Sequence, residues 1–304
     1  MKRGSLETKE LRRLESKERK PIKIIGISSA YRSEHSCARE DPISLQLLKI
    51  ALNEAKKHGA KTELIDLREL KIGPCKECYS TCPAQCRFHE GLNKCDCYPW
   101  SEPRLFLDNG TPLTLEQAYN NLGKKEFLKR MTNNNFYDEG DDMHIIYKAM
   151  READGIIFAG FTSYYSRPAL MQAMISRLCA LDGGVKELWG DGKNLANSIK
   201  YAKNLDNRYK QRLYGRFAAF INVSKEGDSV SPDLMKACTM MGMRIIPFST
   251  CYGVGWYNDT THRSDMKKIL KDSYTIHLAK LIGINIVKEI KNSDRTYGIS
   301  SEVV

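Results

Sequence analysis

The fold is decided by residues 23–67, KIIGISSAYRSEHSCAREDPISLQLLKIALNEAKKHGAKTELIDL, which predict a strand, a helix and a second strand in turn. Lys23 to Ser28 form a short, β-branched apolar run, as in a parallel strand that is buried on both faces. Asp41 and Pro42 predict the helix start, as N-cap and first helical residue. The apolar face of the helix comprises Leu45, Leu48, Leu52 and Ala55. Lys61 to Leu67 predict the second strand, so the stretch indicates a right-handed crossover.

The alternation of helices and strands continues toward the C-terminus after a long polar interruption. The further elements expected are a helix at 141–153, a strand at 155–159, a helix at 168–181, a strand at 216–223, a helix at 232–241, a strand at 243–248 and a helix at 264–290. Strands that alternate with helices in this way form a parallel sheet with helices on both faces. The sequence therefore predicts an α/β fold with a doubly wound, five-stranded parallel sheet.

The chain of 304 residues is long enough for one large α/β domain with insertions. We see no internal repeat and no low-complexity segment that would suggest another architecture. The expected boundaries are a basic, flexible tail at 1–20, a single domain at 21–292 with a cysteine-rich loop at 73–100 and insertions at 101–140 and 183–214, and a C-terminal tail at 293–304.

Charge and hydropathy narrow the possible partners. The formal net charge is +11, and the first 20 residues supply eight Lys or Arg against four Glu. No aromatic residue interleaves with these charges, so we do not expect nucleic-acid binding, whereas a basic surface attracts acidic redox proteins and anionic cofactors. Neither a run of 18 apolar residues nor an apolar leader region is present, and we therefore expect a cytoplasmic protein without membrane contact.

Six of the ten cysteines lie between residues 75 and 97. The six are Cys75, Cys78, Cys82, Cys86, Cys95 and Cys97. The spacing begins C-x2-C-x3-C-x3-C, which allows several thiolates to converge on one soft metal centre. Iron–sulfur clusters and structural zinc both use such ligands, and spacing alone leaves both open. A disulfide framework is not expected, because no secretory leader precedes the segment.

In a doubly wound sheet a ligand binds beyond the carboxyl ends of the strands, where three loops of this chain are expected. The first loop carries Ser28, Ser29, Arg32 and Ser33 and leads into the start of a helix. Hydroxyl groups, a guanidinium and backbone amides at a helix N-terminus suit a phosphate group. The loop is neither a Walker A sequence nor G-x-G-x-x-G, so an ordinary nucleotide-binding fold is not indicated.

The second and third loops follow the strands at 155–159 and 216–223. The second carries four polar and aromatic side chains, Thr162, Ser163, Tyr164 and Tyr165. The tyrosine rings could pack against a flat ring system, and the two hydroxyl side chains could bind its polar atoms. The third carries Ser224, Glu226 and Gly227, whose backbone amides could reach the edge of that ring. A later stretch, residues 251–259, is rich in glycine and aromatics and is expected to cover the site or to meet a partner subunit.

These residues resemble the NAD(P)H-dependent FMN reductases of the flavodoxin-like flavoproteins, and specifically the iron–sulfur flavoproteins. Gly26 to Arg32 are similar to the family's G-I-S-G-S-P-R phosphate loop, and Ser44 corresponds to the Ser or Thr that opens the following helix. Phe161 to Tyr165 resemble the S-P-V-Y-W/F loop, and the helix that follows ends at Arg177 as the family's does. Asp141 to Met143 match a D-D-M sequence before the third helix. The resemblance covers residues 22–290 apart from the insertions.

The resemblance implies a flavodoxin-like sheet in the order 2-1-3-4-5, with noncovalently bound FMN at the three loops. It also implies a [4Fe-4S] cluster that passes electrons to or from FMN, with Cys75, Cys78 and Cys82 as ligands. The expected fourth ligand is Cys86, with Cys95 or Cys97 as alternatives. The expected electron donor is NAD(P)H or a ferredoxin, and the expected assembly is a homodimer or homotetramer.

No catalytic side chain is predicted, because a flavin supplies the redox chemistry itself. His35 and His89 are interpreted as surface residues. Two other functions remain open from the sequence. The first is an NAD(P)H-dependent FMN or quinone reductase whose cysteines hold structural zinc. The second is a flavodoxin-like electron carrier that is not an enzyme.

Overall fold

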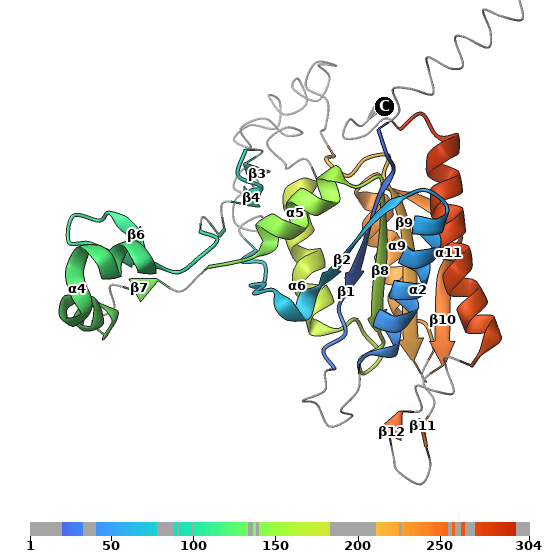
Figure 1. The fold of residues 1–304 in the computed structure, drawn as a ribbon, viewed down its shortest axis with the longest axis horizontal. Coiled ribbons are helices and arrows are strands. Elements are labelled where there is room, and N and C mark those ends of the chain that lie inside the picture. Colours follow the sequence, from blue (N-terminus) through green and yellow to red (C-terminus); the bar gives the residue numbers. More distant parts are fainter. Residues whose placement is uncertain are drawn as a thin grey trace, which may run out of the picture.

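A five-stranded parallel sheet forms the centre of the molecule in the computed structural model (Figure 1). Its spatial order is β2-β1-β8-β9-β10, and every neighbouring pair is parallel. The bounds are Lys61–Asp66 for β2, Lys23–Ser28 for β1, Gly155–Phe161 for β8, Phe217–Ser224 for β9 and Arg244–Val254 for β10. Counted along the chain this is the order 2-1-3-4-5, which is flavodoxin-like. The predicted fold class is confirmed.

The structure describes most of the chain. The described residues are 20–32, 41–77, 88–89, 91–95, 97–98, 100–132, 136–137, 140–182, 211–224, 227–254, 257–258, 263–264 and 271–295. Among them, no helix is both long enough and apolar enough to cross a lipid bilayer.

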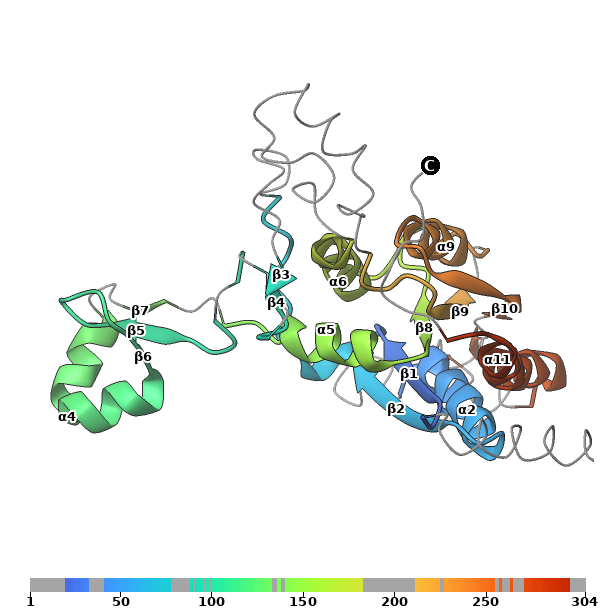
Figure 2. The same ribbon diagram turned by 90° about the horizontal axis from the view of Figure 1, so that it is seen from above.

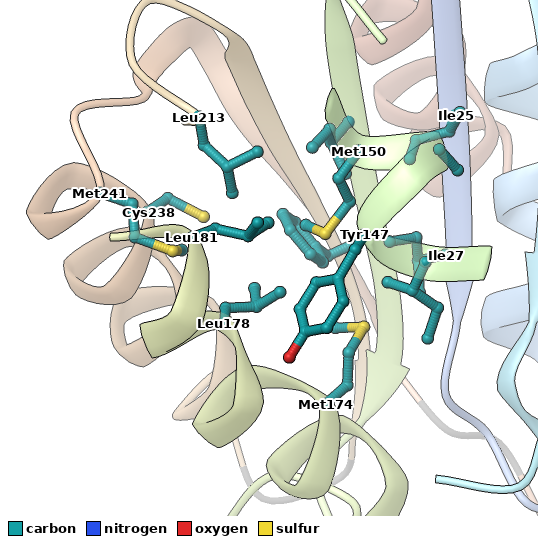
Figure 3. Close-up of a cluster of buried hydrophobic side chains, with 14 of the residues drawn as sticks. Ile25, Ile27, Tyr147, Met150, Met174, Leu178, Leu181, Leu213, Cys238 and Met241 are labelled. Atoms are coloured by element: carbon teal, nitrogen blue, oxygen red, sulfur yellow. The ribbon is translucent and has the colours of Figure 1, made fainter. Parts of the chain in front are cut away.

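Helices cover both faces of the sheet (Figure 2). One face carries α2 and α11, and the other carries α5, α6 and α9, with two short 3₁₀ helices. The bounds are Ile43–Lys57 for α2, Met143–Glu152 for α5, Ala169–Arg177 for α6, Val230–Met240 for α9, Ser273–Asn292 for α11, Leu67–Glu69 for η1 and Leu178–Leu181 for η3. The two faces form two separate hydrophobic cores. Figure 3 shows the core beneath α5, α6 and α9.

Strand β1 shows why the sheet is buried on both sides. Ile25 and Ile27 pack into the core beneath α5, whereas Ile24 packs into the core beneath α2. Successive side chains of a strand point to opposite faces, so an uninterrupted apolar run is what a two-sided burial requires. Gly26 points toward α2, and an added Cβ atom there would lie 2.8 Å from a methyl carbon of both Leu48 and Leu52. The missing side chain therefore lets α2 pack closely against β1.

Several predicted boundaries were wrong, three of them for reasons that the structure makes clear. Helix α2 begins at Ile43, because Pro42 has an extended ψ of 138° and occupies the N-cap position that the sequence assigned to Asp41. Strand β10 continues past a bulge to Val254, so the first residues of the expected loop 251–259 pair with β9 instead. Helix α11 begins at Ser273 rather than at residue 264, because the Asp272 side chain accepts hydrogen bonds from the first amides of the helix.

The described residues between 101 and 140 form an arm that stands clear of the sheet and its helices (Figure 1). The arm has a three-stranded sheet of Arg104–Phe106 (β5), Pro112–Thr114 (β6) and Phe136–Tyr137 (β7), and the helix Leu115–Thr132 (α4). Gly123 interrupts α4 with a φ of 71°. The two ends of the arm meet, since an added Cβ atom on Gly140 would lie 2.7 Å from the carbonyl carbon of Glu102.

Two short hairpins complete the described structure. Strands Phe88–His89 (β3) and Lys94–Cys95 (β4) pair within the cysteine-rich segment. The second hairpin pairs Tyr257–Asn258 (β11) with Arg263–Ser264 (β12). Both pairs are antiparallel, and neither belongs to the central sheet.

Candidate functional site

The first loop presents hydroxyl groups that are buried at the carboxyl end of β1. Ser28 and Ser44 are almost completely buried, with exposed fractions of 0% and 1%. Neither hydroxyl has a hydrogen-bond partner among the described residues. Buried hydroxyl groups are nearly always paired, so these two are candidates for contact with a polar ligand. Ser29 differs, because its hydroxyl donates to the carbonyl oxygen of Ala159 at 3.2 Å and joins β1 to β8.

The start of α2 lies at the same end of β1. No side chain among the described residues caps this helix, and its first turn carries no acidic residue. The first amides of a helix carry partial positive charge and attract anions. The helix start and the Ser28 and Ser44 hydroxyls together suit a phosphate group.

Arg68 holds both described ends of the first loop, and sequence reasoning missed it. Its guanidinium donates to the carboxylate of Asp66 from Nε and Nη2, at 2.9 and 2.6 Å to Oδ2. The same group donates to the carbonyl oxygen of Arg32 and lies 3.5 Å from the carboxylate of Asp41. The hydrogen bond to Asp66 raises the pKa of Arg68. Ser33, the remaining predicted residue of this loop, lies outside the described residues.

The second loop contains a tight turn with two tyrosines at its tip. Ser163 and Ser166 exchange backbone hydrogen bonds of 2.8 and 3.0 Å, which leaves Tyr164 and Tyr165 as the central residues. Both have positive φ, 45° and 61°, as in a type I′ turn. That turn favours Asn and Gly, so the backbone conformation of each tyrosine has a cost in free energy. The two residues are 91% and 67% exposed, and although their rings meet edge to face, burial does not compensate this cost.

A buried amide joins the second loop to the third. Asn222 on β9 donates from Nδ2 to the Thr162 hydroxyl at 3.0 Å and to the Asp228 carboxylate at 2.8 Å. Its side-chain oxygen is buried and has no partner among the described residues. The carboxylate of Asp228 can only accept a hydrogen bond from nitrogen here, which fixes the orientation of the amide. Sequence reasoning missed Asn222, because it lies inside an otherwise apolar strand.

The third loop is fixed by further contacts of the same kind. The Tyr252 hydroxyl donates to the carbonyl oxygen of Ser224 at 2.9 Å and accepts from the amide of Gly227 at 3.2 Å. Ser229 donates to the carbonyl oxygen of Tyr165 at 3.1 Å, so the second and third loops touch again. Glu226 lies outside the described residues. The structure therefore brings most of the predicted ligand residues to one edge of the sheet.

The cysteine-rich segment is described only in part. Cys78, Cys82 and Cys86 lie outside the described residues, as does His35. Cys75 and Cys97 are half-buried, and Cys95 is buried. Within the described part of the chain, no three His, Cys, Asp or Glu side chains come together as a metal site. The β3–β4 hairpin lies beside α5 rather than at the carboxyl edge of the sheet (Figure 1), and His89 is exposed.

Two cysteines outside this segment are buried thiols. Burial raises the pKa of Cys251 to about 12 and also raises the pKa of Cys238. A thiol with a raised pKa stays protonated near neutral pH and is a poor nucleophile and metal ligand. Both belong to the hydrophobic cores.

No protein-family model and no curated protein matches the sequence. Solved structures match the fold. RosB with bound 8-demethyl-8-formylriboflavin-5′-phosphate is 14% identical with a TM-score of 0.53, over 93% of this chain and 92% of that one. A flavone reductase is 16% identical with a TM-score of 0.46, over 91% and 66% of the two chains. A flavodoxin from the domain Archaea is 8% identical with a TM-score of 0.38, over 89% and 99%. At these identities the likeness concerns the fold.

Proposed function

We propose that the chain is an FMN-dependent oxidoreductase. The observation that carries this proposal is the set of buried polar atoms without a described partner at the carboxyl edge of the sheet, the hydroxyls of Ser28 and Ser44 and the side-chain oxygen of Asn222. An unpaired buried polar group costs about 1–3 kcal/mol, which a bound ligand would recover. A phosphate group beside Ser28 and Ser44 and a polar ring beside Asn222 would fit the positions of these atoms.

The phosphate of FMN would be held by the first loop. The proposed contacts are Ser28, Ser29, Arg32, Ser33 and Ser44, together with the first amides of α2. Arg68 would keep the loop in place, because it bonds the backbone of Arg32 and the end of β2. FMN phosphate is dianionic near neutral pH, and the uncapped helix start provides complementary charge.

The isoalloxazine ring would lie against the second and third loops. Tyr164 and Tyr165 offer exposed aromatic faces, and Thr162, Ser163, Ser224, Glu226 and Gly227 would provide polar contacts. Asn222 would accept a hydrogen bond from a ring N–H through its unpartnered oxygen. When bound, FMN supplies hydride and single-electron transfer, so the protein needs only to bind and orient it. RosB, whose fold is similar, binds a derivative of riboflavin 5′-phosphate, which supports this ligand class.

We also propose that the cysteine-rich segment binds a [4Fe-4S] cluster through Cys75, Cys78, Cys82 and Cys86. The support is the spacing of the thiols and the reducing compartment that we expect. Cys95 is the weaker candidate for the fourth ligand, since its sulfur is buried and accepts a hydrogen bond from Arg177 at 3.4 Å. Structural zinc on the same thiols is the alternative. NAD(P)H or a ferredoxin is the proposed electron donor, and a homodimer or homotetramer the proposed assembly.

The test begins with protein purified without oxygen. We expect FMN in about equimolar amount, and weaker FMN binding in Ser28→Ala and Asn222→Ala variants. A chain that binds no FMN contradicts the proposed function. Iron, zinc and acid-labile sulfide are measured on the same sample, and zinc without sulfide contradicts the cluster. Flavin reduction by NAD(P)H with turnover of a quinone distinguishes an enzyme from an electron carrier.

A further inference from the structure

Arg177 is a completely buried cation that contacts both ends of the cysteine-rich segment. Its side chain is 2% exposed and lies at the C-terminal end of α6. Nη1 donates to the carbonyl oxygen of Gly73 at 3.0 Å, two residues before Cys75. Nη2 donates to the sulfur of Cys95 at 3.4 Å. One guanidinium therefore joins the residues that enter and leave the segment.

Asp141 completes the contact from the start of α5. Its two carboxylate oxygens accept from Nη1 and Nη2 of Arg177 at 2.9 and 3.0 Å. The same carboxylate accepts from the amides of Gly73 at 2.9 Å and Met143 at 3.0 Å. Burial alone would lower the pKa of Arg177, but the hydrogen bond to Asp141 raises it, so the arginine stays charged.

Tyr98 closes the arrangement from the other side. The guanidinium lies over its ring, with Cζ 3.9 Å from the ring centre. The Tyr98 hydroxyl donates to the carbonyl oxygen of Pro74 at 2.6 Å. The residues before Cys75 and after Cys97 are thus bonded to each other as well as to Arg177. We call Arg177, Asp141, Gly73, Cys95 and Tyr98 the clasp.

Stability alone is a weak explanation for the clasp. Replacing a buried ion pair with apolar side chains of similar size is often neutral or stabilising, because both charges lose their hydration. Figure 3 shows the apolar core that adjoins this ion pair, around Tyr147 and Leu178. The guanidinium adds geometric specificity, because its rigid, planar set of N–H donors holds four acceptors in fixed positions.

We propose that Arg177 is a positioning residue that preorganises the cysteine-rich segment for metal binding, with Cys95 as an anchor rather than a ligand. This inference rests on the proposed metal site. Bringing together the ends of a loop costs conformational entropy, and the clasp meets that cost before any metal binds. Outer contacts that orient metal ligands typically change metal affinity by about 10- to 100-fold.

The test uses the full chain with its segment reduced and metal-free, titrated with Cd²⁺. The variant is Arg177→Met, and the matched control is Arg295→Met. Arg295 also pairs with a buried carboxylate, that of Asp154, at 2.9 and 2.8 Å, but directly before β8 and without contact to the cysteine-rich segment among the hydrogen bonds of the described residues. Both variants leave one buried carboxylate without its arginine, so a general loss of stability affects both.

We expect Arg177→Met to bind Cd²⁺ about 10- to 100-fold more weakly than the wild type, and Arg295→Met to bind it unchanged. Arg177→Lys keeps the charge without the fork and should resemble Arg177→Met. Alkylation of Cys95 by iodoacetamide, followed by mass spectrometry, should accelerate in Arg177→Met alone. If Arg177→Met does not fold, the double variant with Asp141→Asn replaces it.

The outcomes separate the two proposals. If the wild type binds no Cd²⁺, both the metal site and this inference are wrong. If the wild type binds Cd²⁺ and Arg177→Met binds it equally well, with unchanged Cys95 alkylation, the metal proposal stands and the inference is wrong. If Cys95→Ala abolishes Cd²⁺ binding, Cys95 is a ligand and its role as an anchor is wrong. FMN binding is independent of all three results.

Discussion

The turn at Tyr164 and Tyr165 offers a test in which stability and ligand binding should change in opposite directions. The change is the double variant Tyr164→Asn and Tyr165→Gly, which installs the residues that a type I′ turn favours. Each tyrosine now has positive φ, and left-handed backbone costs about 1–2 kcal/mol per residue. Removing this backbone strain at both positions should stabilise the folded state by about 2–4 kcal/mol. Part of that gain, about 1 kcal/mol, is offset because glycine loses more conformational entropy on folding.

The net expectation is a gain of about 1–3 kcal/mol in the free energy of unfolding of the flavin-free protein. Loss of the rings should subtract little, because they are 91% and 67% exposed. A gain of that size corresponds to a rise of about 2–4 °C in Tm per kcal/mol for a chain of about this size. Thermal unfolding monitored by circular dichroism measures it.

FMN affinity should fall in the same variant. Stacked aromatic pairs contribute about 0.5–1.5 kcal/mol each beyond the area they bury. Loss of two rings therefore predicts FMN binding about 5- to 140-fold weaker, measured by the quenching of flavin fluorescence. The control, Tyr164→Phe with Tyr165→Phe, keeps both rings and the strained backbone and should change neither quantity. A variant that is less stable than the wild type, or that binds FMN equally well, refutes the reasoning.

Three further substitutions test other parts of the structure. Ser28→Ala should weaken FMN binding about tenfold but leave riboflavin binding unchanged, because the hydroxyl is assigned to the phosphate; equal losses for both ligands would contradict that assignment. Gly26→Ala should destabilise the fold by about 1–3 kcal/mol in urea unfolding, because its Cβ would lie 2.8 Å from two leucines of α2. In the Asp272→Asn variant, the free energy of unfolding should fall less steeply as the pH is lowered. Hydrogen bonds from Thr275 lower the pKa of Asp272, so its contribution is present above the unfolded pKa and lost as pH falls through the folded value.

The sheet was predictable because its signal is local. Each buried strand is a short apolar run, and Ile24, Ile25 and Ile27 are buried just as the run in β1 indicates. The end of β10 was not predictable, because Pro247 indicates a strand end and the exposed Phe248 follows it with a φ of 51°. The strand resumes only because pairing with β9 restores the register at Thr250.

The candidate site was predictable only where polar residues lie in loops. Ser28, Thr162 and Tyr164 were predicted because they lie at or just after the carboxyl ends of strands, where ligands of this fold bind. Asn222 and Arg177 were missed for the opposite reason. Asn222 is one polar residue in an apolar strand, and Arg177 ends a helix, where a basic side chain usually faces solvent. Their importance depends on partners that are distant in sequence.

The arm has a consequence for how this chain can vary. Its ends lie against each other at Glu102 and Gly140, so the 37 residues from 103 to 139 begin and end at one point of the surface. Exchanging them for a four-residue linker would change the entropy of loop closure by only about 2 kcal/mol. The arm is thus a module that evolution or an engineer can replace, lengthen or remove while the sheet and its ligand loops keep their positions.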